Sequence, residues 1–307
     1  MSIKRKLPIY IGGLVTASLV VAGLISYNTS SNSLINASKD GLHTNTERTS
    51  VIIRNLEKSE EQMASIMANN KRLQDLVVMK EQTNDQQFYT SNNVLLGAVN
   101  NFLKDSFATT TNHDHFFVLD NKGTDIADSL PENERKSFAD RDYFSKALQG
   151  QTAIGKMVIS KTNGKPVIVI AVPVKDSQGK IVGVLGNSIL ADFFTSNIQG
   201  IKVGTNGKVY IMDRDSTILG HSQDKTWVNK KSQRTELLDA MKTLPNDNNV
   251  NVSTIDAGTG SDKSLVTFAN IPGTNWVVFL EDKYSDIQSP VRSLMVETLL
   301  GLLCLAL

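Results

Sequence analysis

Residues 115–129 read HFFVLDNKGTDIADS, and this stretch decides the fold. An apolar run ends at Asp120, an Asn-Lys-Gly turn follows, and a second short run completes a predicted β-hairpin. Residues 209–222, VYIMDRDSTILGHS, have the same layout and align without a gap at an offset of 93, which pairs Asp120 with Asp213 and Phe117 with Tyr210. The chain therefore contains an internal repeat.

A second pair of segments extends the repeat. GKPVIVIAVPV at 164–174, followed by IVGVLGNSILAD, resembles KSLVTFANIP at 263–272, followed by WVVFLEDKYSD. Each copy is predicted to be a five-strand antiparallel unit with a helix between its second and third strands. The fold class is therefore α+β, with two tandem modules joined near 198–203.

Composition narrows the function classes. The 307 residues are 40% hydrophobic and 21% charged, enough for about two domains with proper cores. Lys and Arg (32) balance Asp and Glu (31), so the chain has no strongly basic character and nucleic acid is not an expected partner. The single cysteine, Cys304, excludes a disulfide framework and a Cys-based zinc site within one chain.

The N-terminal region predicts a membrane anchor. Residues 7–25, LPIYIGGLVTASLVVAGLI, carry no charge and are long enough to cross a hydrocarbon core of about 30 Å. A cleaved signal peptide is the alternative, but its apolar region is usually shorter. We expect residues 1–6, with Lys4, Arg5 and Lys6, to be cytoplasmic, 7–26 to span the cell membrane, and the following chain to lie outside the cytoplasm.

The C-terminal residues 298–307, TLLGLLCLAL, are purely apolar. We expect 294–307 to begin a second transmembrane helix that is incomplete, as in a chain whose cytoplasmic part follows. The alternative is a short tail packed on the outer domain. Two spans that bracket a large outside region are typical of receptors, although this step is an analogy.

Residues 27–85 predict a long stalk helix. Apolar or small residues recur near a seven-residue step, and the stripe includes polar Thr49. We expect the lower part to pack in a homodimer and the upper part to lie on the sheet of its own chain. The residues expected to contact a second copy are Leu42, Ile53, Leu56 and Met63.

The ordered motifs resemble a known family. The long helix is followed by FFVLD, by FADRDYFSKALQG at 138–150, and by ISKTNGKPVIVIAVPV at 159–174. Together with the second copy, this order resembles the double Cache extracytoplasmic sensor domain, over about residues 30–290. The family is best known from bacterial methyl-accepting chemotaxis receptors and also occurs on histidine kinases and diguanylate cyclases. The resemblance implies a membrane-distal, ligand-binding module at 86–198 and a membrane-proximal module at 199–290.

The predicted ligand site centres on Arg141, which directly precedes a predicted helix capped by Asp142 and ended by Gly150. A guanidinium beside free N-terminal amides can hold a carboxylate or another small anion. In the family, an Arg-x-aromatic-aromatic run marks the distal pocket, and Arg141, Tyr143 and Phe144 match it. The alternative is that Arg141 pairs with a neighbouring aspartate while Phe144 only fills core.

Family members that bind amino acids share a fuller pattern, which this chain keeps only in part. Lys136 stands where that pattern has its leading tyrosine, and Ser160 falls near the position of its strand aspartate. A buried ammonium group without a carboxylate partner is costly, so a small organic acid or a purine-like ring fits at least as well as an amino acid. Another aspartate can supply the carboxylate, and the candidates are Asp120, Asp125, Asp128 and Asp192. The expected ligand-binding set is Arg141, Tyr143, Phe144, Phe117, Ser160, Asp128 and Asp192.

Catalysis and cofactors are not expected. His113 and His115 lack a third spaced ligand, and no glycine-rich segment has the layout of a phosphate loop. The proximal copy, with KTWVNKKSQRTELLDAM at 225–241, is predicted to lack the Arg and the paired aromatics and to transmit rather than bind, with Trp227 as a possible second ligand contact. The ligand and the type of cytoplasmic output stay open. The alternative functions are the sensor part of a kinase or cyclase, or a membrane-anchored binding module without signalling.

Overall fold

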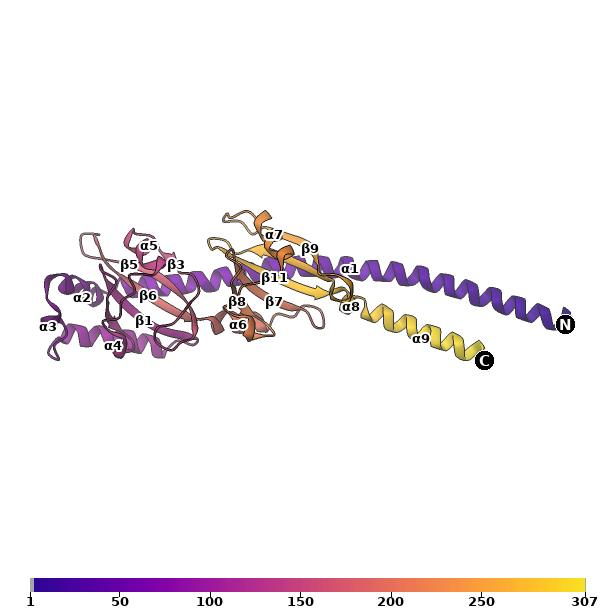
Figure 1. The fold of residues 1–307 in the computed structure, drawn as a ribbon, viewed down its shortest axis with the longest axis horizontal. Helices are drawn as coiled ribbons and strands as arrows, with labels where there is room; N and C mark the ends of the chain where they lie inside the picture. Colours follow the sequence, from indigo (N-terminus) through magenta and orange to yellow (C-terminus); the bar gives the residue numbers. More distant parts are fainter. Residues whose placement is uncertain (1–2, 307) are drawn as a thin grey trace.

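One helix forms the spine of the molecule. The computed structural model describes residues 3–306, and α1 (Ile3–Ala68) runs from the N-terminal apolar segment along both modules (Figure 1). At 1.5 Å per residue its 66 residues span about 100 Å. Because α1 ends at Ala68, the prediction of one helix over 27–85 is wrong at its C-terminal end. Asn70 stops α1 because its side chain accepts hydrogen bonds from the amides of Arg72 and Leu73, which caps a separate helix, α2 (Lys71–Gln82).

The distal module is built on a six-stranded antiparallel sheet of order β2-β1-β6-β5-β3, with β4 also paired to β5. Its strands are β1 (His113–Asp120), β2 (Asp125–Asp128), β3 (Ala153–Ile154), β4 (Val158–Ile159), β5 (Pro166–Lys175) and β6 (Ile181–Leu190). Its helices besides α2 are α3 (Asp85–Phe88), α4 (Val94–Ala108), the 3-10 turn η1 (Pro131–Asn133) and α5 (Asp142–Leu148). β4 is the one strand beyond the five predicted.

The proximal module repeats this layout in a five-stranded sheet of order β8-β7-β11-β10-β9. Its strands are β7 (Lys208–Asp213), β8 (Ile218–His221), β9 (Val252–Ala257), β10 (Ser264–Asn270) and β11 (Trp276–Lys283). Its helices are η2 (Lys225–Trp227), α7 (Thr235–Thr243) and η3 (Gly260–Asp262), and α6 (Ala191–Gln199), which connects the two modules, packs on β7 and β8. In both modules the helix α5 or α7 follows the second strand, so the predicted α+β fold of two antiparallel modules is confirmed.

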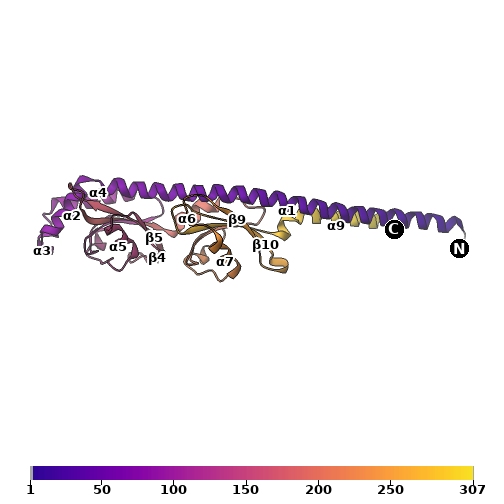
Figure 2. The same ribbon diagram turned by 90° about the horizontal axis from the view of Figure 1, so that it is seen from above.

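The apolar stripe of α1 packs on the chain's own sheets. Figure 2 shows α1 along one side of both modules, with α5 and α7 on the other side. Leu42 and Ile53 are 4% and 1% exposed in the core of the proximal module, with Leu56 packed beside them, and Met63 packs on the distal core. The expectation of contact with a second copy is therefore wrong for Leu42 and Ile53, because β-sheets of the same chain already cover them, and it stays a prediction for the half-buried Leu56 and Met63.

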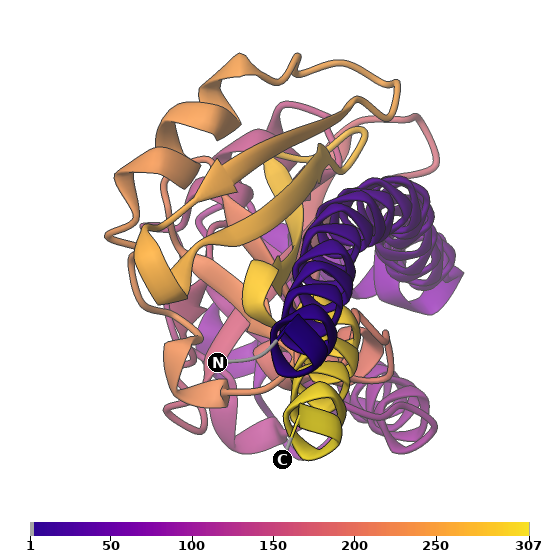
Figure 3. The ribbon, with the colours of Figure 1, turned by 90° about the vertical axis from the view of Figure 1, so that its right-hand side faces the viewer.

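The chain ends beside its own beginning. After α8 (Tyr284–Ile287), α9 (Ser289–Ala306) runs along α1, as the end-on view in Figure 3 shows. The side chain of Gln288 donates to Ser31 Oγ at 2.7 Å where the two helices meet. Within residues 3–306, α1 is the one helix long and apolar enough by length and composition to cross a membrane. The second span at 294–307 stays a prediction.

Candidate functional site

The two faces of the distal sheet have different roles. Along β1, Phe116 and Val118 belong to the core under α1, α2 and α4, whereas Phe117 and Leu119 belong to the core under α5. This alternation follows from the period of two residues in a strand. The side of the sheet away from α1 is therefore where the predicted site residues collect.

A small pocket lies on this side, between α5, the β1 and β5 strands, and the β4 segment. It is lined by Asp114, His115, Phe117, Phe138, Arg141, Tyr143, Val158, Ile159, Ser160, Lys161, Val167, Val169 and Ser188. The free space is about 10 Å³, close to the room that one water molecule needs. The pocket is thus almost filled by its own side chains, so a ligand larger than a water molecule requires the lining of the pocket to move.

Asp114 is the electrostatic centre of the pocket. Its Oδ2 accepts hydrogen bonds from His115 Nδ1 at 2.8 Å, Ser160 Oγ at 2.7 Å and Ser188 Oγ at 3.2 Å, and its Oδ1 accepts from Asn163 Nδ2 at 2.5 Å. Burial acts to raise the pKa of Asp114, but the hydrogen bonds from His115 and the serines outweigh it and lower the pKa. The pocket therefore holds a fixed negative charge at neutral pH.

Arg141 lies on the same pocket as the candidate positive charge. It is the N-cap residue of α5, with extended backbone, and its side chain is 18% exposed. Among the described residues its buried Nε has no hydrogen-bond partner, and the nearest carboxylate oxygen, Oδ2 of Asp140, is 3.9 Å away. The guanidinium of Arg141 thus has no closely paired carboxylate among the described residues. The predicted cap by Asp142 is wrong, because Asp142 is already inside α5 and pairs with Lys146 instead.

The other predicted aromatics divide between pocket and core. Tyr143 and Phe117 line the pocket, and the ring of Phe117 stacks on Phe138 at 5.0 Å. Burial raises the pKa of the Tyr143 hydroxyl, so it stays protonated as a donor. Phe144 is buried in the core under α5 and does not border the pocket. Ser160 lines the pocket as expected, as a hydrogen-bond donor to Asp114 rather than as the site of the missing charge.

Asp128 and Asp192 lie outside the pocket. Asp128 is fully buried behind it, with Oδ2 3.7 Å from Nε2 of His115. Asp192 is in the first turn of α6, half-exposed, and pairs with Lys225 of η2 at 3.3 Å. Asp120, also considered as a carboxylate source, caps its own hairpin by accepting from the amides of Lys122 and Thr124.

Sequence reasoning missed Asp114 because of a β-bulge. The pairing of β1 with β6 shifts register between His113 and His115, so Asp114 leaves the strict alternation of the strand. Asp114 and His115 then both reach the pocket, together with Phe117. The HDH triplet was the only available signal, and without the bulge it indicates a solvated loop end.

Comparison with known proteins agrees with this arrangement. The model of a family described as Cache domain (dCache_1) matches residues 30–291, which is most of the chain. The chain belongs to the Cache domain family. No curated protein sequence gives a match.

Solved Cache sensor structures share the fold. The sensory domain of the Campylobacter jejuni chemoreceptor Tlp3 with isoleucine bound is 15% identical with a TM-score of 0.60, over 84% of this chain and 97% of that one. The sensor domain of the Vibrio cholerae histidine kinase DctB is 17% identical with a TM-score of 0.60, over 81% and 98%. The ligand-binding domain of Mlp24 with asparagine is 14% identical with a TM-score of 0.58, over 87% and 99%. Cache sensor domains are ligand-binding modules that carry out no catalysis.

The proximal Cache module has the same framework as the distal one. The strand registers make the two copies comparable, because His115 pairs with Ser188 in the distal sheet as Lys208 pairs with Glu281 in the proximal one. The expectation that the proximal copy lacks the arginine is wrong. Arg234 is the N-cap residue of α7, as Arg141 is of α5. Trp227 is 47% exposed on the surface at the end of η2.

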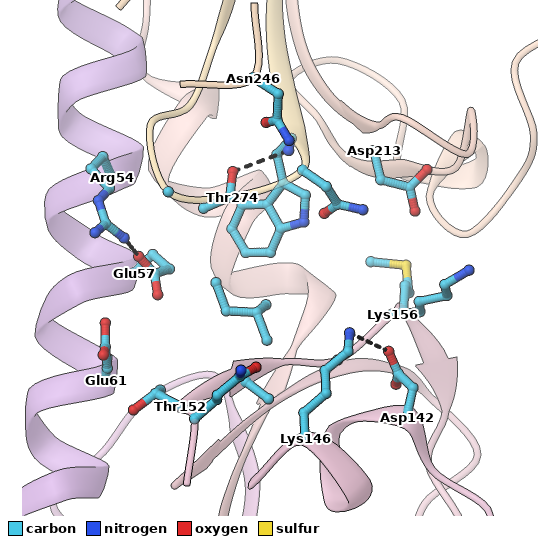
Figure 4. Close-up of a pocket in the computed structure, with 18 of the residues that line it drawn as sticks. Arg54, Glu57, Glu61, Asp142, Lys146, Thr152, Lys156, Asp213, Asn246 and Thr274 are labelled. Atoms are coloured by element: carbon cyan, nitrogen blue, oxygen red, sulfur yellow. Dashed lines mark hydrogen bonds and ion pairs between the residues drawn. The ribbon is translucent and has the colours of Figure 1, made fainter. Parts of the chain in front are cut away.

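A larger cavity of about 640 Å³ lies between the two Cache modules and α1 (Figure 4). Ion pairs line it, with Arg54 against Glu57 on α1 and Lys146 against Asp142 on α5. Burial raises the pKa of Glu57 despite the Arg54 charge. None of the seven predicted ligand residues lines this cleft. Four of them line the small distal pocket, namely Phe117, Arg141, Tyr143 and Ser160. Within residues 3–306 no three His, Cys, Asp or Glu side chains are grouped closely enough to hold a metal ion.

Proposed function

We propose that the chain is the extracytoplasmic sensor part of a transmembrane chemoreceptor, and that its distal Cache module binds a small molecule carrying both a carboxylate and an ammonium group. The observation that carries the proposal is the pair of opposite charges on one closed pocket. Asp114 supplies a buried negative charge, and Arg141 supplies a guanidinium whose Nε lacks a partner in the described part of the chain.

The charges favour an amino acid over a plain organic acid. Arg141 can accept a carboxylate by charge-assisted hydrogen bonds. Asp114 can accept an ammonium group, because the hydroxyls of Ser160 and Ser188 can rotate away from it and each hydroxyl can also accept. The Tlp3 and Mlp24 structures contain isoleucine and asparagine, which supports the same ligand class here.

The membrane arrangement is part of the proposal. Residues 7–26 would span the cell membrane, 1–6 would face the cytoplasm, and 86–198 and 199–290 would form the outer modules. The apolar start of α1 supports this arrangement, since it is exposed over Leu7, Tyr10 and Leu14. A homodimer in the membrane completes the receptor.

A histidine kinase sensor is the second candidate, because the DctB sensor domain is as similar in fold as Tlp3. The cytoplasmic output decides between the two. The reading frame after Leu307 tests this directly, since a chemoreceptor continues into a long helical signalling region and a kinase into a phosphotransfer domain. A stop codon there would favour a membrane-anchored binding module.

Binding by Arg141 is tested by replacing it. Thermal-shift screening of the detergent-purified chain against amino acids, dicarboxylates and purines supplies the ligand. Arg141→Ala should then weaken binding by about 2 to 4 kcal/mol, which is roughly 30- to 900-fold in Kd by calorimetry. Arg72→Ala is the matched control, because Arg72 is exposed on α2 of the same module. Unchanged affinity of Arg141→Ala for a ligand that binds wild type would refute the site.

A further inference from the structure

The proximal module carries a carboxylate where the distal module has its pocket. Register equivalence is direct, because Glu281 in β11 faces Lys208 in β7 as Ser188 in β6 faces His115 in β1. A small hydroxyl that borders the distal pocket is thus replaced by a long acidic side chain. Glu281 is 5% exposed, so its carboxylate lies inside the module.

Three donors surround this carboxylate. Arg234 Nη1 donates to Glu281 Oε2 at 2.6 Å, and the Tyr210 hydroxyl donates to the same oxygen at 3.1 Å. Lys208 Nζ lies 3.5 Å from Oε1. Burial acts to raise the pKa of Glu281, but the charges of Lys208 and Arg234 outweigh it and lower the pKa. Glu281 is therefore ionised at neutral pH, with two hydrogen bonds to Oε2 and an ion pair to Oε1.

Aromatic rings fill the rest of the equivalent space. Phe279 faces Tyr210 where Gly186 faces Phe117 in the distal sheet, and the Phe279 and Tyr210 rings stack at 5.1 Å. Phe268 stacks on Phe279 at 5.6 Å. The proximal module thus has an arginine at the N-terminus of α7 and a carboxylate paired with that arginine. Aromatic rings lie where the distal module has its pocket.

We propose that the proximal module contains a carboxylate-binding site, formed by Arg234, Tyr210 and Lys208, which the chain occupies with its own Glu281. Glu281 acts as a built-in ligand that holds the start of α7 on β7 and β11. The proximal module is thereby kept in one closed arrangement, and its site becomes available to free carboxylates of small size once the Glu281 side chain is removed. The argument rests on the repeat and not on the identity of the distal ligand.

Chemical rescue tests this site. The full chain carrying Glu281→Ala, purified in detergent, should melt at a lower temperature than wild type, because Lys208 and Arg234 lose the buried carboxylate that lies between them and Arg234 keeps only Glu236, at 3.0 Å. Sodium formate or acetate, titrated against sodium chloride at constant ionic strength, should raise the melting temperature of the variant along a saturating curve. Wild type should show no such saturable rise.

Two further variants separate the site from general salt effects. Glu281→Gln keeps the side-chain shape, so acetate should give no rescue there. In Glu281→Ala with Arg234→Ala, the rescue should be lost, because the main anchor is gone. A Glu281→Ala variant that melts early with no saturable response, or an equal response in the double variant, would overturn the proposal. If Glu281→Ala does not fold, Arg234→Ala tests the same pair by removing the arginine instead of the acid. Methylguanidinium at millimolar concentration should then stabilise Arg234→Ala and not wild type. The absence of such stabilisation would also overturn the proposal.

Discussion

Asp125 is predicted to cost stability at neutral pH, and its replacement by Asn should reveal that cost. Asp125 lies in β2 with no exposed surface, and neither of its carboxyl oxygens has a hydrogen-bond partner among residues 3–306. Asp128, also fully buried, is the nearest source of like charge. Burial, followed by the charge of Asp128, raises the pKa of Asp125 well above its usual value.

The direction of the pH dependence follows from this shift. A carboxyl whose pKa is raised by folding contributes stability that is fully present below its unfolded pKa and is lost as pH rises through the folded pKa. Asn has the shape of protonated Asp and cannot ionise, and its amide can donate to Asp128 Oδ2, which lacks a partner in the described chain. Asp125→Asn should therefore match wild type near pH 4 and become increasingly more stable as pH rises. The gain at high pH should be on the order of 1 to 3 kcal/mol, the usual cost of a buried polar group without a partner.

Thermal unfolding of the purified chain between pH 4 and 9 measures the effect, and Asp128→Ala is the control. Asp128 Oδ1 accepts from the amide of Leu130 at 2.7 Å, so removal of this acceptor should destabilise the distal module. A loss of stability in Asp125→Asn that grows as pH rises would refute the reasoning, since it would mean that the ionised carboxylate of Asp125 stabilises the fold.

Two other predictions concern packing and assembly. Gly186→Ala should lower the free energy of unfolding by about 1 to 3 kcal/mol, because a Cβ there would lie 2.1 Å from Phe117 Cζ. Gly97→Ala on α4 is the control and should not lower it, because the space around Gly97 is open. If the receptor is a homodimer joined along α1, disulfide crosslinking in native membranes should be efficient for Val51→Cys, which is 43% exposed, and weak for Leu42→Cys, which is buried; the reverse order would contradict the packing of α1.

The sheets could be predicted because their signals are local and repeated. The Asn-Lys-Gly turn after Asp120 and the turn after Asp213 each follow a short apolar run. The structure closes both hairpins with backbone hydrogen bonds in which the amides of these aspartates donate to the carbonyls of Thr124 and Thr217. The end of α1 was missed because the helical pattern continues past it. Asn70 ends the helix through its side chain, a local hydrogen bond that periodicity does not record.

A site residue could be predicted from the sequence only where its side chain and its neighbours before a helix match a recognisable pattern. Arg141 stands out in sequence because two aromatic residues follow it, whereas Arg234 is followed by Thr235 and Glu236 and gives no such signal. Asp114 and Glu281 depend on tertiary pairing: a bulge turns the first toward the pocket, and the register of β11 against β7 places the second beside Lys208. Long-range register is the part that single-sequence patterns do not carry.

One short segment of the chain connects the distal pocket with the cleft between the modules. Val158, Ile159 and Ser160 line the pocket, and the residues just before them, 151–157, line the cleft between the modules. In that segment Lys156 pairs with Asp215 of the proximal module at 2.7 Å. The free space of the pocket is about 10 Å³, so a ligand bound there requires its lining to move, and that lining includes residues 158–160 and residues of α5, which also borders the cleft through Asp142 and Lys146. If the distal module binds a ligand as proposed, we therefore expect binding to change the spacing of the modules. A proximal module held closed by Glu281 would carry that displacement as a rigid body to β11, α8 and α9, beside the N-terminal part of α1.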